Sequence, residues 1–215
     1  MAQKKDVKKD IEEQKLQKTF IPKSFKAQFE QSFSSSLNGK LRSGNGIFSY
    51  MYPGRIRLEI LEPNSDRSTF VCNSKKSWYY NPPFDETEKG QVTIQSSDKL
   101  NIVKFFDTMS VGLKSNKRFD VKESKKQKET FIEIVFKGKT VNEIGVKSAK
   151  IFPKDYDKNE INLKNIQFNS IGGIELTYPD EKKVRLTFKN IEENVTFSEK
   201  DFEFIIPANT KIIER

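Results

Sequence analysis

Few side chains in this sequence have the type and spacing that catalysis or metal binding requires. The absence of histidine excludes His-dependent triads and His metal ligands, and a single cysteine, Cys72, excludes an internal disulfide and a Cys zinc cluster. The adjacent carboxylates Asp85-Glu86 and Glu192-Glu193 lie in polar stretches typical of solvated turns. Gly172-Gly173 has no helix pattern after it, as a phosphate-binding loop would need. We therefore predict no catalytic residue, no metal site and no cofactor.

The composition is that of a folded protein without a membrane-spanning helix. Its 215 residues fit one domain, and 34% hydrophobic residues with 18 Phe are too rich for a disordered chain. The longest apolar runs, such as Phe204-Ile205-Ile206, are far shorter than the roughly 18 residues that a spanning helix needs. The net charge of +9 favours an acidic partner, an anionic membrane or a nucleic acid.

The first 22 residues are predicted to form a separate segment before a single domain at residues 23–215. Residues 4–18 are expected to form an exposed, charged helix that ends before Pro22. Residues 1–18 have the lysines of a signal peptide but no apolar stretch after them. The sequence therefore predicts either a cytosolic protein or one whose leader is absent from this chain.

Alternation of apolar and polar residues predicts β-strands over most of the domain. Strands are expected at residues 25–33, 48–52, 55–60, 69–72, 77–80, 91–95, 131–137, 143–152, 160–168, 173–178, 183–188 and 202–206. Apolar residues recur at helical spacing within residues 100–114, the one internal helix expected, and the lysine-rich residues 122–128 are expected to form an exposed loop. Many short strands with few helices predict a mainly β (α+β) antiparallel meander.

Several of these strands and turns carry motifs in a fixed order. The motifs are Phe25-Lys26-Ala27-Gln28-Phe29-Glu30-Gln31, Gly46-Ile47-Phe48 with Pro53-Gly54 and Arg57, Glu62-Pro63, Trp78-Tyr79-Tyr80-Asn81-Pro82, and Phe202-Glu203-Phe204-Ile205-Ile206-Pro207. They resemble the F-x-A-x-F-x-Q, G-x-F-x-x-x-x-P-G-x-x-R, E-x-P, W-x-Y-x-P and F-x-F-x-x-P patterns of the LolA family of periplasmic lipoprotein carriers. The resemblance spans residues 25–213 and is weakest between residues 115 and 160.

This resemblance implies an incomplete, strongly curved antiparallel β-barrel with covering helices around an apolar cavity. It also implies a periplasmic carrier, not an enzyme, which receives acylated lipoproteins from an inner-membrane ATP-driven transporter. The carrier would pass them to an outer-membrane acceptor protein of similar fold. A leader absent from this chain would fit that location, and we expect the carrier to be a monomer.

One-sided apolar strands supply the expected cavity, and the internal helix supplies its lid. A mobile cover that competes with the ligand for one surface would make the release of acyl chains possible. The predicted ligand-binding residues are Phe25, Phe29, Phe33, Phe48, Tyr50, Tyr52, Ile56, Leu58, Ile60, Trp78 and Tyr80, and the predicted lid residues are Ile102, Phe105, Phe106, Met109 and Leu113. The same pattern is also typical of an ordinary core between a sheet and a helix.

One position departs from the family pattern. Many members have an arginine immediately before the proline of the P-G turn, where it hydrogen-bonds the cover; here that residue is Tyr52. A tyrosine hydroxyl donates one hydrogen bond and brings no positive charge. We therefore expect either that the closed state is held differently or that the ligand differs.

Two alternatives stay open beside the lipoprotein carrier, and a third, nucleic-acid binding, is not favoured. A lipid or glycolipid carrier on the same fold is favoured by the departure at Tyr52, and an envelope-stress sensor module would instead bind a protein. Nucleic-acid binding is motivated only by the net charge of +9. Because the lysines alternate with acidic residues and accompany no RNA- or DNA-binding motif, we expect no nucleic-acid partner.

Overall fold

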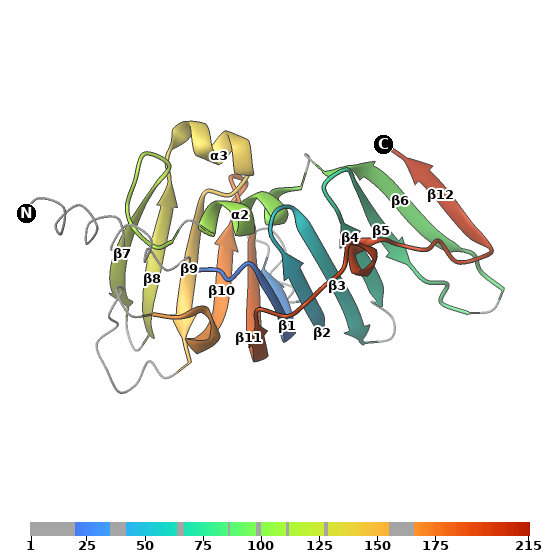
Figure 1. Ribbon diagram of the computed structural model, residues 1–215, viewed down its shortest axis with the longest axis horizontal. Coiled ribbons are helices and arrows are strands. Elements are labelled where there is room, and N and C mark those ends of the chain that lie inside the picture. Colours follow the sequence, from blue (N-terminus) through green and yellow to red (C-terminus); the bar gives the residue numbers. More distant parts are fainter. Residues whose placement is uncertain are drawn as a thin grey trace, which may run out of the picture.

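The computed structural model describes residues 20–34, 42–63, 67–85, 87–97, 100–110, 112–126, 129–154 and 166–215. Within these ranges the strands form one 12-stranded sheet in the order β12-β6-β5-β4-β3-β2-β1-β11-β10-β9-β8-β7 (Figure 1). The strands are β1 (Ser24–Ser34), β2 (Arg42–Met51), β3 (Arg55–Glu62), β4 (Ser68–Cys72), β5 (Lys76–Asn81), β6 (Gly90–Ser96), β7 (Phe119–Lys126), β8 (Glu129–Phe136), β9 (Ser148–Pro153), β10 (Ile171–Thr177), β11 (Lys183–Glu193) and β12 (Thr210–Glu214). This open, curved sheet confirms the predicted mainly β fold.

The sheet consists of two antiparallel meanders. Strands β1 to β6 form the first meander and β7 to β11 form the second, each strand pairing with the next along the chain. The meanders join where β11 returns beside β1, with Phe188 opposite Phe29. The last strand, β12, pairs in parallel with β6 and ends the sheet on the side of the first meander.

The pairing register assigns side chains to two faces of the first meander. In an antiparallel pair, residues directly opposite each other point to the same side of the sheet. Phe48 lies opposite Leu58, and Leu58 opposite Phe70, so these three share one face, which we call the inner face. Arg57 lies opposite Val71, and Val71 opposite Trp78, on what we call the outer face.

Both α-helices of the described ranges contribute residues to the main core. Helix α2 (Asn101–Met109) buries Val103, Phe105, Phe106, Thr108 and Met109. Helix α3 (Gly138–Ile144) ends at Gly145, whose φ of 64° is the left-handed conformation that glycine adopts readily at a helix C-terminus. No helix in the described ranges has the length and apolar content to cross a membrane.

Several expected elements were wrong in the second meander and at the C-terminus. The strand expected at residues 143–152 is preceded by α3, and β9 begins only at Ser148. The lysine-rich residues expected as a loop belong to β7 up to Lys126; β7 is an edge strand, where exposed lysines are common. The strand expected at residues 202–206 is replaced by a 3₁₀ turn, η4 (Glu199–Phe202), and extended chain, because the final pairing is made by β12.

Other expectations fall wholly or partly outside the described residues. These include the charged helix at residues 4–18 and most of the strand expected at residues 160–168, whose described end enters the 3₁₀ turn η3 (Phe168–Ser170). The expected internal helix is present, but it ends at Met109 rather than at residue 114.

Candidate functional site

The inner face of the first meander carries a continuous aromatic layer that α2 covers. The ring of Phe106 on α2 lies 5.1 Å from that of Phe48 and 5.5 Å from that of Tyr50, centroid to centroid. Phe25 stacks on Phe48 at 5.5 Å and lies 5.9 Å from Phe106. A single ring of α2 therefore packs against aromatic residues of both β1 and β2.

Most of the predicted ligand-binding residues meet in this layer. Phe25, Phe29, Phe48, Tyr50, Ile56 and Leu58 are buried in one core, and Ile60 packs against it while partly buried. Phe33 and Tyr52 are instead 40% and 46% exposed. Because α2 packs against the inner face over these residues, their role in ligand binding stays a prediction that requires α2 to move.

Trp78 and Tyr80 lie on the outer face, away from that layer. Trp78 is opposite Val71 and Tyr80 is opposite Thr69, whereas Ser77 is opposite the inner-face Cys72. The ring of Tyr80 contacts that of Phe204 at 5.3 Å. Sequence alternation places Trp78 and Tyr80 on the same side of β5, but only the pairing register shows which side of the sheet that is.

The predicted lid residues come together on α2 and just beyond it. Phe105, Phe106 and Met109 are buried in the main core, and Ile102 and Leu113 are partly buried against it. Phe105 also contacts Phe136 of β8 at 6.1 Å, so α2 touches the second meander as well as the first.

A half-buried carboxylate on α2, that of Asp107, was not among the predicted site residues and links the helix to the sheet. The hydroxyl of Tyr50 donates a hydrogen bond of 2.8 Å to Oδ1 of Asp107, and the backbone N–H of Gly54 donates one of 3.1 Å to the same oxygen. We call this arrangement the Asp107 contact. Burial raises the pKa of Asp107, while the two hydrogen bonds and nearby Arg55 act in the opposite direction.

The neighbours of Asp107 are held in their neutral forms. Burial, and then the charge of Asp107, raise the pKa of the Tyr50 hydroxyl, so it remains a donor. The same two causes raise the pKa of the Cys72 thiol to about 12. Cys72 is fully buried, as expected from the sequence, and its protonated thiol is a poor nucleophile.

Tyr52 does not provide the link to α2. Its backbone N–H donates to the carbonyl of Lys23 at 2.7 Å, and its side chain is 46% exposed. The link arises from Tyr50, two residues earlier, and from Gly54, two residues later. The available signal in the sequence was Asp107 itself, an acidic residue between the apolar Phe106 and Met109.

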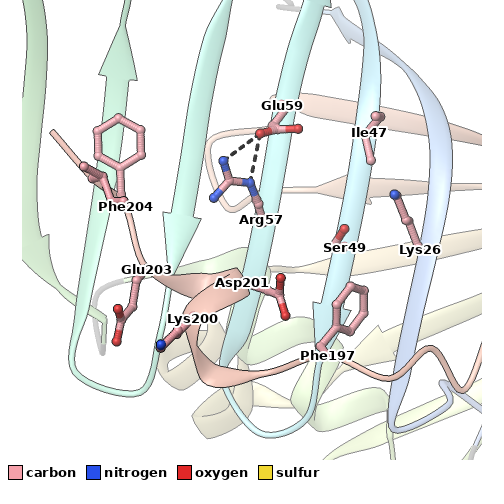
Figure 2. A pocket seen from close by; sticks show the side chains of 11 residues that line it. Lys26, Ile47, Ser49, Arg57, Glu59, Phe197, Lys200, Asp201, Glu203 and Phe204 are labelled. Atoms are coloured by element: carbon pink, nitrogen blue, oxygen red, sulfur yellow. Dashed lines mark hydrogen bonds and ion pairs between the residues drawn. The ribbon is translucent and has the colours of Figure 1, made fainter. Parts of the chain in front are cut away.

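The outer face carries a pocket of about 450 Å³ beneath residues 194–209, which we call the C-terminal segment. Figure 2 shows Lys26, Ser49 and Arg57 along the sheet, with Phe197 and Phe204 on the C-terminal segment. Arg57 Nε donates to Glu59 Oε1 at 2.9 Å, so the charges of these two pocket residues neutralise each other. In the described part of the chain no group of three or more His, Cys, Asp or Glu residues could hold a metal ion.

The C-terminal segment is fixed to the sheet by polar contacts. Arg55 forms two hydrogen bonds with Glu199, of 2.8 Å from Nε to Oε2 and 2.6 Å from Nη2 to Oε1. Ser198 and Asp201 cap the η4 turn reciprocally, which lowers the pKa of Asp201. The Ser24 hydroxyl adds a hydrogen bond of 2.7 Å to the Val195 carbonyl.

The adjacent carboxylates of the sequence show no catalytic arrangement where they are described. Asp85 Oδ1 accepts hydrogen bonds from the backbone N–H and the hydroxyl of Thr87, which lowers the pKa of Asp85 in an exposed turn. Glu192 is exposed and Glu193 accepts from the backbone N–H of Asn169 at 3.0 Å. Both observed arrangements are structural hydrogen bonds of turns and strand ends.

Comparison with known proteins identifies related sequences. The family described as "Outer membrane lipoprotein carrier protein LolA" matches residues 22–205. Outer-membrane lipoprotein carrier proteins of Shewanella woodyi and Shewanella baltica are each 33% identical over 63 residues, which are 29% of this chain and 29% of each relative. A LolA superfamily crystal structure from Nitrosomonas europaea aligns with a TM-score of 0.46 at 10% identity, over 89% of this chain and 95% of that one.

Proposed function

The chain belongs to the family of outer-membrane lipoprotein carrier proteins, LolA, and on this premise we propose that it binds the acyl chains of lipoproteins on the inner face of its sheet. The family is periplasmic, and we propose the same location for this chain. We further propose that it is a carrier rather than an enzyme, and that it takes lipoproteins from an inner-membrane ATP-driven transporter to an outer-membrane acceptor.

The observation that carries this proposal is the aromatic inner face covered by one short helix. Helix α2 has nine residues, and helices of that length are marginally stable in water without packing. Its order therefore depends on the same apolar surface that an acyl chain would need. Ligand and helix would compete for Phe25, Phe48 and Tyr50.

The energies of the two competitors are of similar size. Burial of Val103, Phe105, Phe106 and Met109 stabilises closed α2 by about 6–12 kcal/mol, at roughly 1.5–3 kcal/mol for each side chain. An acyl chain of about fifteen methylenes gains about 12 kcal/mol at roughly 0.8 kcal/mol each. An acyl chain can therefore displace α2 and still dissociate, because repacking of α2 on the inner face offsets most of the binding free energy that the departing acyl chain loses.

A direct test uses a fluorescent long-chain acyl probe and hydrogen exchange of the full chain. We expect probe binding to accelerate amide exchange in α2 and to leave exchange in β1 to β3 unchanged. A probe that binds with no change in α2 exchange would contradict the proposal.

Mass spectrometry of an organic extract of the purified protein identifies the ligand. Acylated peptide supports the lipoprotein carrier, whereas free lipid or glycolipid favours the alternative carrier on the same fold. An extract with neither, from a protein that also fails to bind the probe, would exclude both carriers.

A further inference from the structure

The ends of the second meander next to α3 carry a strongly basic surface. Three segments form it, residues 114–120, 137–147 and 178–183, and we call this surface the basic rim. We propose that the basic rim docks the protein on a membrane surface that carries anionic phospholipid headgroups. This docking goes beyond the carrier role and does not depend on it.

Hydrogen bonds between the segments show that they are neighbours in space. The backbone N–H of Lys137 donates to the carbonyl of Arg118 at 2.9 Å, and that of Phe136 to Lys147 at 3.2 Å. In turn the N–H of Lys147 donates to Thr177 at 2.8 Å, and Thr177 pairs with Lys183. The rim is therefore one continuous edge that follows the ends of β7 to β11.

The rim has a large excess of positive charge. Its three segments contain eight basic and four acidic residues, a net charge of +4 out of +9 for the whole chain. The four acidic residues pair with rim cations: Asp120 with Lys137, Glu143 with Arg118, Asp180 with Lys182, and Glu181 with Lys147. The other four cations, Lys114, Lys117, Lys139 and Lys183, are exposed and have no ion pair to a described residue.

The chemistry of the rim favours a bilayer surface over a protein partner. Specific protein interfaces are enriched in aromatic residues at their centre and depleted in lysine. None of the large hydrophobic residues exposed in the described part of the chain lies in the three rim segments. A membrane that contains anionic phospholipids instead presents a negatively charged surface that attracts separate lysines without shape complementarity.

The position of the rim is suited to such docking. Gly145, at the end of α3 within the rim, lies directly against Asn101, the first residue of α2. A membrane bound at the rim would therefore lie beside the end of the helix that covers the inner face.

Vesicle flotation of the full chain tests the proposal with two variants of equal charge. Lys117→Glu/Lys139→Glu alters the rim. Lys200→Glu/Lys211→Glu makes the same charge change outside it, at Lys200 in η4 beside the first meander and at Lys211 on β12, the strand at the opposite end of the sheet from β7. Vesicles of phosphatidylcholine, with and without about 30% phosphatidylglycerol, are compared in about 50 mM and about 500 mM salt. We expect the anionic vesicles alone to bind wild type, with release at high salt, and the rim variant to bind at least about tenfold less than the control.

The proposal would be overturned by equal binding to neutral vesicles, by equal losses in the two variants, or by no flotation of wild type at low salt. Capture of the acyl probe without vesicles is measured in parallel. Vesicle docking with no probe capture would support membrane docking by the rim and contradict the carrier role. Probe capture with no vesicle docking would support the carrier role and contradict membrane docking by the rim.

Discussion

The two faces of the first meander are covered in physically different ways. On the inner face, α2 rests on rings of β1 and β2, and the Asp107 contact is its polar link to Tyr50 and Gly54. On the outer face, the C-terminal segment is held by the two hydrogen bonds from Arg55 to Glu199 and by that from Ser24 to Val195, in addition to the buried ring of Phe202.

This difference indicates which cover can be exchanged. Apolar contacts are non-directional, so a hydrocarbon chain can replace those of α2 with little loss. Hydrogen bonds and bidentate ion pairs require particular partners in a fixed geometry, which an acyl chain does not supply. We therefore expect α2 to open and the C-terminal segment to stay in place, and four predictions test that contrast.

The largest effect is expected from removing the central ring of the inner cover. Phe106→Ala should favour the open state of α2 by about 3 kcal/mol, because a buried phenylalanine is replaced by a cavity, and should raise acyl-probe affinity by up to about a hundredfold. Titration with the probe measures the affinity, and hydrogen exchange measures the opening of α2.

The matched change on the outer face is Phe204→Ala, which removes a ring that contacts Tyr80. It should lower the free energy of global unfolding by about 1–2 kcal/mol, because Phe204 is only half-buried, and leave probe affinity unchanged. If both variants changed probe affinity equally, the two covers would not differ as we infer.

A smaller effect is expected from the Asp107 contact. Tyr50→Phe removes one of two donors to the half-buried Asp107 carboxylate, which should destabilise closed α2 by about 1–2 kcal/mol and raise probe affinity about fivefold to thirtyfold. The comparison variant is Glu199→Gln, which weakens the pair with Arg55 on the outer face. Probe affinity in Glu199→Gln should equal that of wild type; a larger gain there than in Tyr50→Phe would refute this assignment.

The pH dependence of opening should follow the titration of Asp107. Burial in the closed state raises its pKa above the ordinary value of 3.8, so closed α2 binds the proton more tightly than open α2 does. The closed state is therefore most favoured at low pH and loses stability as the pH rises through the raised pKa. Probe affinity should increase over that range in wild type, and Asp107→Asn should remove this dependence while leaving a folded protein.

The first meander was predicted well because its local and tertiary signals agree. Strands near Phe25, Phe48 and Ile56 alternate strictly, and their apolar sides all face the same core. Alternation does not show on which face of a sheet a side chain lies. For that reason Trp78 and Tyr80 are predicted beside the inner-face aromatic residues, whereas the pairing register places them on the outer face. The C-terminal segment offers the outer face of β5 an apolar contact, that of Phe204 with Tyr80. No local sequence pattern distinguishes this contact from one with the core on the inner face.

The second meander and the Asp107 contact were harder to predict for different reasons. The segment Gly138–Ile144 contains Thr140, Val141 and Ile144, whose β-branched side chains favour strands, yet it is a helix that buries Thr140 and Ile144 and ends at the left-handed Gly145. The Asp107 contact joins residues 57 positions apart in the sequence. A single acidic residue on an apolar helix carries no sign of its partner until the strand pairing is known.

The smallest effect is expected at the position where the family pattern is broken. Tyr52→Phe removes a hydroxyl from a side chain that is 46% exposed, and it preserves the backbone hydrogen bond to Lys23. Surface changes of this kind alter stability by less than about 0.5 kcal/mol, so probe affinity and release rate should stay within about twofold of wild type. Stopped-flow release of the probe distinguishes the two tyrosines. An effect of Tyr52→Phe greater than that of Tyr50→Phe would mean that the polar link to α2 remains at the family position. The exposed hydroxyl of Tyr52, rather than the buried hydroxyl of Tyr50, would then hold α2 closed.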